Sequence, residues 1–120
     1  MRTPIAGPRL AVTIAALALA SLPLRADDAA YIGTWALNVA NCKAPQESQD
    51  APLVIAKDRY DQHEVHCTFK SVTPKDGDYA VAGDCLVEGN QQAYDFTLTV
   101  SGDTLTFTDE AGARDFLRCK

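Results

Sequence analysis

The chain alternates between apolar and polar residues over several short runs. One run starts at Gly33-Thr34-Trp35 and includes Leu37, and the others span residues 65–70, 79–88, 94–100 and 104–108. A period of two is typical of strands that bury one face, because successive side chains point to opposite sides of a sheet. The aromatic residues on the inward parity are Trp35, Phe69, Tyr79, Phe96 and Phe107.

Turn-forming residues separate these runs at short intervals. Lys75-Asp76-Gly77-Asp78 and Val100-Ser101-Gly102-Asp103 carry the signals of tight β-hairpins. Glu88-Gly89-Asn90 and Glu110-Ala111-Gly112 supply two further turns in the second half of the chain. After residue 26 we find no apolar stripe of helical period longer than two turns. The pattern therefore predicts seven or eight antiparallel strands in up-and-down order.

So short an all-β chain closes most easily as a small barrel, because closure removes exposed sheet edges. We expect one domain, residues 27–120, folded as a small antiparallel up-and-down β-barrel stapled by disulfides. A barrel of about eight strands has an interior only just wide enough for its own side chains or one small ligand. We therefore expect the inward aromatic residues to fill it and to leave no deep pocket.

Residues 1–26 have the layout of a secretory signal peptide. Arg2 and Arg9 give a positive start, residues 10–22 are almost wholly apolar, and Pro23 ends the run before Ala26. A membrane anchor needs about 20 apolar residues, and this run is shorter. We expect cleavage after Ala26 and a soluble mature protein, without a membrane anchor, in the periplasm or outside the cell.

The charge balance changes once this leader is removed. The whole chain has a net charge of −5, and the first 26 residues hold three arginines and no acid, so the remainder carries −8. Net acidity without a basic run excludes a protein that binds nucleic acid through its phosphates.

Four cysteines, all after residue 26, fit an oxidising compartment. They are Cys42, Cys67, Cys85 and Cys119. An even number with no Cys-x-x-Cys pair and no histidine at zinc-finger spacing predicts two disulfides rather than a metal site. Paired thiols also exclude a cysteine nucleophile.

Gly33-Thr34-Trp35 and Arg118 carry a resemblance to calycin-type barrels. In these barrels the tryptophan of a G-x-W motif packs beneath an arginine of the final strand, which implies a contact between Trp35 and Arg118. The length and the early G-x-W are similar to the small barrel inhibitors of secreted metalloproteases, whose inhibitory N-terminal arm would correspond to residues 27–30. The stretch 33–38 leading to Cys42, with Glu64-x-x-Cys67 and Arg118-Cys119, also resembles uncharacterised exported proteobacterial proteins.

The cysteine pairing has two solutions. A hairpin centred on Asp76 places Cys67 opposite Cys85, which leaves Cys42 for Cys119. Directly opposed residues on adjacent strands, however, have a Cβ spacing near the upper limit of disulfide geometry.

The consecutive pairing, Cys42–Cys67 with Cys85–Cys119, is the one we prefer. If Arg118 reaches the tryptophan, as the resemblance implies, Cys119 lies at the same barrel end as Cys85 and Cys42 lies at the other. Each disulfide then joins neighbouring strands at its own end.

Candidate chemistry is sparse. His63-Glu64-Val65-His66 contains His-x-x-His, but on a strand two residues three apart point to opposite faces and do not share a metal. Asp76-Gly77-Asp78 lacks the spacing of a calcium loop and is interpreted as a hairpin turn. No nucleophile elbow or phosphate-binding glycine loop is present in the sequence. We expect no enzyme activity, no cofactor and no metal.

These observations leave three hypotheses for function. The first is an exported, non-enzymatic binding protein that inhibits a secreted or host hydrolase, such as a protease or lysozyme, through residues 43–51 or the arm 27–30. The second is a carrier of a small apolar ligand at the barrel mouth. The third is a structural envelope protein with no discrete ligand.

Overall fold

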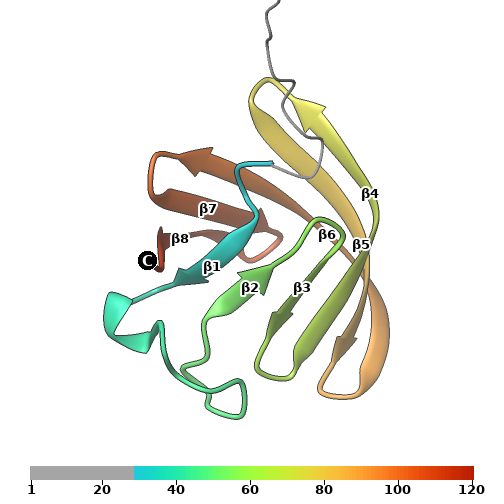
Figure 1. Cartoon of the computed structure of the whole chain (residues 1–120). Helices are drawn as coiled ribbons and strands as arrows, with labels where there is room; N and C mark the ends of the chain where they lie inside the picture. Colours follow the sequence, from blue (N-terminus) through green and yellow to red (C-terminus); the bar gives the residue numbers. More distant parts are fainter. Residues whose placement is uncertain (1–28) are drawn as a thin grey trace, which may run out of the picture.

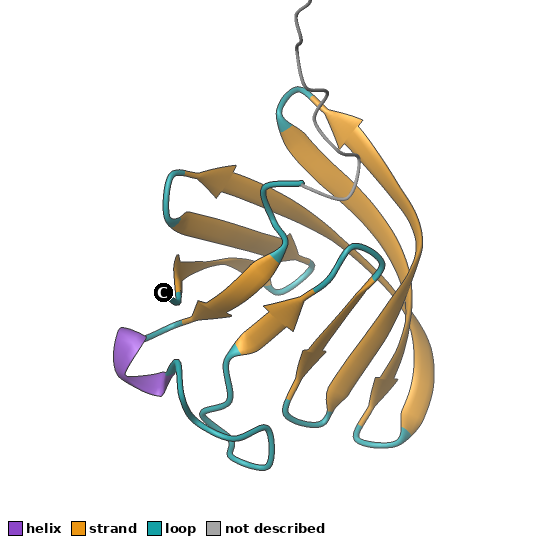
Figure 2. Cartoon of the chain, in the orientation of Figure 1, coloured by secondary structure: helices purple, strands orange, loops and turns teal. Residues whose placement is uncertain are grey.

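The computed structural model describes residues 29–120, which form a closed antiparallel barrel of eight strands in sequence order (Figure 1). The strands are β1 (Gly33–Ala36), β2 (Leu53–Ile55), β3 (Arg59–Gln62), β4 (Val65–Lys75), β5 (Asp78–Val87), β6 (Asn90–Ser101), β7 (Thr104–Asp109) and β8 (Gly112–Arg118). One 3₁₀ turn, η1 (Val39–Asn41), follows β1 (Figure 2). The predicted fold is confirmed. The predicted signal peptide, 1–26, and residues 27–28 of the predicted arm lie outside the described residues.

The hairpin turns follow the glycine signals of the sequence. Asp76 and Gly77 both have positive φ, at 53° and 89°, and so do Glu88 and Gly89, at 52° and 86°. Two consecutive residues of positive φ are the mark of a type I′ turn, whose twist matches that of the flanking strands. The β4–β5 and β5–β6 hairpins are therefore set by local backbone chemistry.

The barrel interior is filled by aromatic and aliphatic side chains. Trp35, Phe69, Phe96 and Phe107 are buried as predicted, and Tyr79 is half-buried beside them. Their rings meet mainly edge to face, and Phe96 and Phe107 stack with centroids 4.7 Å apart. Aromatic pairs of this kind add about 0.5–1.5 kcal/mol each beyond the area that they bury.

Leu37 departs from the predicted pattern. It shares the parity of Trp35, but its exposed fraction is 60%. The cause is the end of β1 at Ala36, after which the chain turns into η1 and leaves the sheet. Parity has no meaning beyond the last paired residue.

The preferred disulfide pairing was wrong. Cys67 is bonded to Cys85, and Cys42 to Cys119. The β4–β5 register explains the first disulfide: the strands pair Val72 with Val81, and a bulge between Phe69 and Ser71 then shifts the register by one residue. After that shift Cys67 lies directly opposite Cys85, with Cα atoms 4.0 Å apart. Opposed pairs alternate between wide and close spacing, and this is a close one.

The second disulfide is explained by η1. We expected Cys42 to continue toward the far end of the barrel, but successive hydrogen bonds turn the chain back after β1, from Asn41 to Asn38 and from Cys42 to Val39. The reversed chain meets Cys119, which follows β8 and donates its N–H to the Thr34 carbonyl. The bond therefore joins the chain just after the first strand to the chain just after the last.

Strand lengths leave one side of the barrel incomplete. β6 pairs with β5 from Asn90 onward, but β7 pairs with β6 only from Thr97. The first half of β6 has no ladder partner on its other side, at the end of the barrel that faces down in Figure 1. This gap positions the site described below.

Candidate functional site

The predicted signature residues come together where β1 meets β8. Trp35 and Arg118 are paired in register, and the Arg118 guanidinium carbon lies 4.2 Å from the Trp35 ring centroid. Gly33 has a φ of +147°, and a Cβ built on it would lie 3.3 Å from Arg118 Nη1. The glycine therefore leaves room for the guanidinium. The Trp35 side chain is fully buried, so this trio closes the barrel and the indole is not open to a ligand. Arg118, however, is partly exposed and lines a hollow beside the Cys42–Cys119 disulfide.

The histidine window does not form a metal site. His63 lies in the β3–β4 turn, where its Nδ1 is 3.0 Å from the Gln46 carbonyl oxygen. His66 faces outward on β4, and its Nδ1 is 2.7 Å from Asp61 Oδ1, which also accepts from Arg59. Burial alone would raise the pKa of Asp61, but the hydrogen bonds from Arg59 and His66 lower it. Among residues 29–120 no three potential ligands gather around a common point.

A cavity of about 350 Å³ opens at the end of the barrel beside the β3–β4 and β5–β6 turns. Its lining residues all occupy inward-facing positions of the strands. The apolar ones are Val65, Val87, Phe107 and Phe116, and the polar ones are Tyr60, Gln62, Gln92, Tyr94 and Arg114. The interior is packed as expected, and the space that remains is this cavity at the barrel mouth.

A polar cluster crosses the gap between β6 and the β7–β8 hairpin at this cavity. The Tyr94 hydroxyl and Arg114 Nη2 both donate to Asp109 Oδ2, the latter at 3.0 Å, and the Ala111 N–H donates to Oδ1 at 2.9 Å. The Asp109 side chain is only 8% exposed. The cluster joins strands that share no ladder at this point, so it also has a structural role.

The pKa values of the cluster follow from these contacts. The hydrogen bonds from Tyr94 and Arg114 lower the pKa of Asp109 to about 2. Burial, together with the bond to Asp109, raises the pKa of Tyr94 to about 12. At neutral pH the cluster is a carboxylate held between a neutral phenol and a guanidinium, and Arg114 also lies over the Phe107 ring, 5.2 Å from its centroid.

Tyr60 is the unusual member of the cavity lining. Its side chain is only 3% exposed, and its ring packs edge to face on Phe96 and Phe107. Burial raises the pKa of its hydroxyl, which therefore stays protonated, and none of the residues in the described chain gives it a hydrogen bond. Buried polar groups are nearly always hydrogen-bonded. A buried donor in a cavity wall is placed to bind an acceptor on a ligand.

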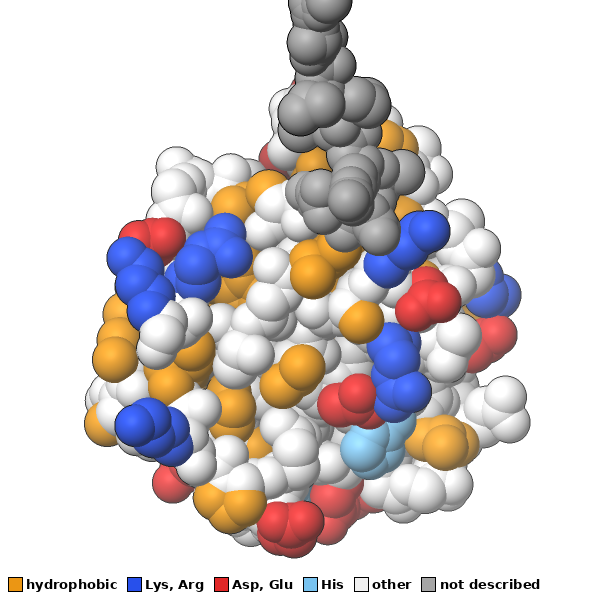
Figure 3. Space-filling view, in the orientation of Figure 1, with side chains coloured by type: hydrophobic (Ala, Val, Ile, Leu, Met, Phe, Trp, Pro, Cys, Tyr) orange, Lys and Arg blue, Asp and Glu red, His pale blue; other side chains and the backbone are white. Residues whose placement is uncertain are grey.

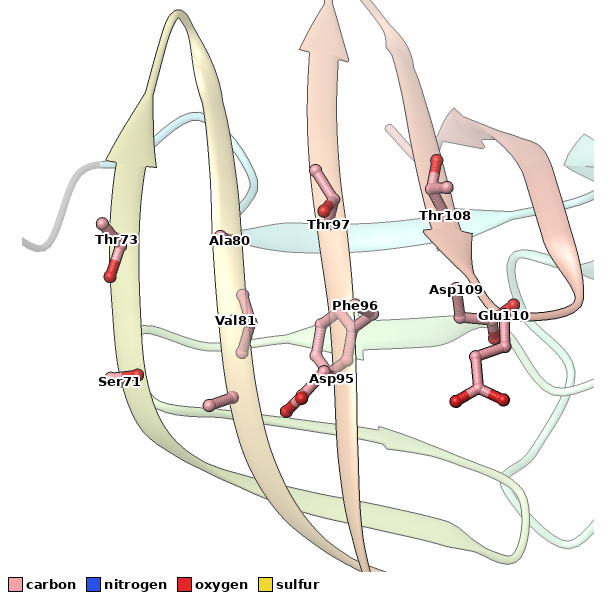
Figure 4. Close-up of a pocket in the computed structure, with 11 residues that line it drawn as sticks. Ser71, Thr73, Ala80, Val81, Asp95, Phe96, Thr97, Thr108, Asp109 and Glu110 are labelled. Atoms are coloured by element: carbon pink, nitrogen blue, oxygen red, sulfur yellow. The ribbon is translucent and has the colours of Figure 1, made fainter.

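A second hollow, of about 470 Å³, lies on the outer face of β4, β5 and β6 (Figure 4). Small side chains such as Ser71, Thr73 and Ala80 line it, with the exposed carboxylates of Asp95 and Glu110 at one side. Acidic groups that face solvent need no partner. The one buried carboxylate that lines this hollow, that of Asp109, already accepts from Tyr94, Arg114 and the Ala111 N–H, so nothing here points to a ligand.

A third hollow, of about 460 Å³, lies beside the Cys42–Cys119 disulfide. We call its surroundings the disulfide face, defined by Val39, Lys43, Leu117 and Lys120. Val39 is 58% exposed and Leu117 is 41% exposed. Figure 3 shows basic side chains bordering apolar ones on the side where the C-terminus lies in Figure 1. Adjoining exposed apolar side chains are a feature of interaction surfaces.

The predicted contact loop, residues 43–51, is anchored rather than free. The disulfide at Cys42 fixes its start, and the Gln46 side chain accepts from the His63 N–H at 2.8 Å and donates to the Pro52 carbonyl at 3.0 Å. The loop therefore packs against the β3–β4 turn.

Sequence reasoning missed the cavity and its polar cluster. Tyr94 has the parity of Phe96 in the alternating run 94–100, but Tyr60 lies in a strand of only four residues that shows no clear alternation. The signal that was available is polar: Gln92, Tyr94 and Arg114 occupy inward positions of strands otherwise occupied by apolar residues. Inward polar residues near strand ends indicate an open barrel end.

No helix among the described residues is long and apolar enough to cross a membrane. Comparison with protein families, curated proteins and solved structures finds no match to this chain in any of the three.

Proposed function

We propose that this is an exported, non-enzymatic binding protein that holds a small molecule in the mouth cavity of the barrel. The observation that carries the proposal is the buried Tyr60 hydroxyl without a partner among the described residues, in a cavity that also exposes Arg114. Apolar walls with a few converging polar groups are typical of small-molecule sites, whose volumes start at about 300 Å³. The cavity therefore fits one small ligand.

The protonation states support binding rather than catalysis. General acid–base catalysis at neutral pH needs a group whose pKa lies near 7. Around the cavity, the pKa of Asp109 is about 2, that of Tyr94 is about 12, and that of Tyr60 is raised further by burial. These groups hold their protons or charges fixed, which suits recognition.

Export is supported by the leader-like residues 1–26 and by the pairing of all four cysteines. Disulfides persist in oxidising compartments. We therefore place the mature protein in the periplasm or outside the cell.

Two matched variants test the binding site. Val87 faces the cavity, and its neighbour Leu86 points outward from the same strand and is exposed. Val87→Trp fills the mouth, whereas Leu86→Trp adds the same bulk outside. Titration with an environment-sensitive fluorescent naphthalene probe should show binding to the wild type and to Leu86→Trp, and loss of binding to Val87→Trp. Equal binding by both variants, or none by the wild type, would overturn the proposal.

A second candidate function is inhibition of a secreted or host hydrolase. The observation that favours it is the disulfide face, where exposed Val39 and Leu117 line one hollow with Lys43 and Lys120, beside the Cys42–Cys119 disulfide. A rigid scaffold loses little conformational entropy on binding. The charge of −8 after the leader would speed encounter with a cationic target such as a lysozyme, an effect that salt weakens. The lysines of the disulfide face, in contrast, favour an acidic patch on the target at the contact itself.

Residual activities of a c-type lysozyme and a secreted zinc metalloprotease, measured with micromolar mature protein, test this candidate. Inhibition that is lost in Leu117→Asp and kept in Leu86→Asp would support it, because both leucines are exposed but only Leu117 lies on the disulfide face. Undiminished activity of both enzymes would remove it. If the naphthalene probe also fails to bind in the mouth cavity, the remaining hypothesis is a structural envelope protein without a discrete ligand.

A further inference from the structure

Two groups in the wall of the mouth cavity, Tyr60 and Arg114, have donor capacity that no described residue uses. Tyr60 keeps its proton, and Arg114 commits one N–H to Asp109. A guanidinium carries five N–H groups, so Arg114 retains donors for a ligand. Tyr94 differs, because its only hydrogen is donated to Asp109.

The lining contains no carboxylate of its own. Asp109 lies behind Tyr94 and Arg114, and its two oxygens already accept from three donors within the chain. The cavity wall therefore offers no free carboxylate to pair with a cationic ligand. A ligand that supplies an anionic acceptor would match both donors.

The apolar part of the wall is half aromatic, and Gln62 and Gln92 are the remaining polar residues of the lining. Phe107 and Phe116 line the cavity, together with Val65 and Val87. The volume of about 350 Å³ lies near the lower end of the range of roughly 300–1,000 Å³ for small-molecule sites. A flat, compact ligand fits such walls better than a long flexible chain, because ring faces and edges pack well against aromatic side chains.

We propose that the ligand of the mouth cavity is a small aromatic carboxylate. Its carboxylate accepts hydrogen bonds from the Tyr60 hydroxyl and from the Arg114 guanidinium, and its ring packs against Phe107 and Phe116. This inference rests on the proposed function and adds the chemistry of the ligand. Hydrogen bonds to an ionised acceptor are shorter and about twice as strong as neutral ones, so charge distinguishes the carboxylate from its neutral analogues.

Tyr60→Phe is the sharpest variant, because it removes one oxygen and leaves the ring packing intact. If the hydroxyl has no partner in the free protein, its loss should leave stability unchanged or slightly raised. Tyr31→Phe is the matched control: Tyr31 is equally buried, but its hydroxyl donates to the Lys57 carbonyl at 3.1 Å, away from the cavity. This control should lower stability and keep ligand affinity.

The experiment measures the dissociation constants of 2-naphthoate, 2-naphthamide and decanoate for the mature protein and both variants by calorimetry. We expect 2-naphthoate to bind about tenfold or more tightly than the amide, and Tyr60→Phe to weaken naphthoate binding about tenfold. Equal affinities for acid and amide, or an unchanged Tyr60→Phe, would overturn the carboxylate while leaving the cavity as a binding site. Decanoate bound as tightly as naphthoate would overturn the aromatic preference. If none of the three binds, this inference and the proposed function both fail.

Discussion

Replacing Asp109 by asparagine should destabilise the barrel in a pH-dependent way. The carboxyl of Asp109 has a pKa of about 2 in the folded protein against an ordinary value of 3.8. Each pH unit of difference corresponds to about 1.36 kcal/mol, so the full effect is about 2.5 kcal/mol at neutral pH. Solvent at the open barrel end screens part of it, and we expect a loss of about 1–2.5 kcal/mol.

The sign of the pH dependence follows from the lowered pKa. A carboxyl with a depressed folded-state pKa contributes its full stability above the unfolded value, here 3.8, and loses it as the pH falls through about 2. The wild type should therefore lose stability between pH 4 and pH 2, and Asp109→Asn should lose less over that interval. The difference between the two proteins should shrink toward zero below pH 2.

Urea unfolding measures this directly, with Trp35 fluorescence as the signal. Trp35 is the only tryptophan and is fully buried, so its emission reports global unfolding. Glu110→Gln is the control, because Glu110 is the exposed neighbour of Asp109 and should change stability by less than about 0.5 kcal/mol. If Asp109→Asn is as stable as the wild type at pH 7, or if the gap persists undiminished at pH 2, the assignment of the cluster is refuted.

Three further predictions concern the rest of the barrel. Arg118→Met should lower the free energy of unfolding by about 0.5–2 kcal/mol by removing the cation from the Trp35 face, as measured by urea unfolding. Replacing both Cys42 and Cys119 by serine should lower the free energy of unfolding by about 4.5 kcal/mol. Removing the Cys67–Cys85 disulfide should cost only about 3 kcal/mol, because it closes a shorter loop. Thermal unfolding of the two double variants gives their order. The pKa of Tyr94 is raised to about 12 in the folded protein. The stability that its hydroxyl contributes is therefore complete below pH 10 and is lost as the pH rises through 12. Alkaline unfolding monitored by circular dichroism measures this loss.

The strands and hairpins could be predicted because their determinants are local. Alternation over residues 65–69 and 79–87 matches the burial of β4 and β5, and the Asp76-Gly77 pair alone specifies the turn between them. β2 and β3 had no such signal, since strands of three and four residues are too short to show a period. Only barrel closure defines them.

The disulfide pairing depended on a feature that alternation does not reveal. A two-residue turn alone would place Cys85 opposite Thr68, and the bulge after Phe69 moves Cys67 into that position. A bulge adds one residue to one strand of a pair, and the residue types on either side of it do not mark its position in the sequence. A hairpin centred on Asp76 also places Cys67 opposite Cys85, so the error lay in the expected spacing: this opposed pair is a closely spaced one, which a disulfide can join.

The mouth cavity was missed for a related reason. Barrel size suggested a filled interior, and the filled part does extend over Phe69, Phe96 and Phe107. Whether an end is open depends on relative strand lengths, here on β6 starting well before its pairing with β7. Inward polar residues such as Tyr94 and Arg114 were present in the sequence, but their meeting with Asp109 required the three-dimensional register.

Chemical-shift mapping of the ¹⁵N-labelled mature protein, titrated with 2-naphthoate, tests the central claim most directly. The account predicts saturable shifts of the backbone amides of Gln62, Val87 and Gln92, which line the mouth cavity. The amides of Val39 and Leu117 on the disulfide face should stay unchanged. Shifts confined to the disulfide face, or none up to millimolar ligand, would contradict it.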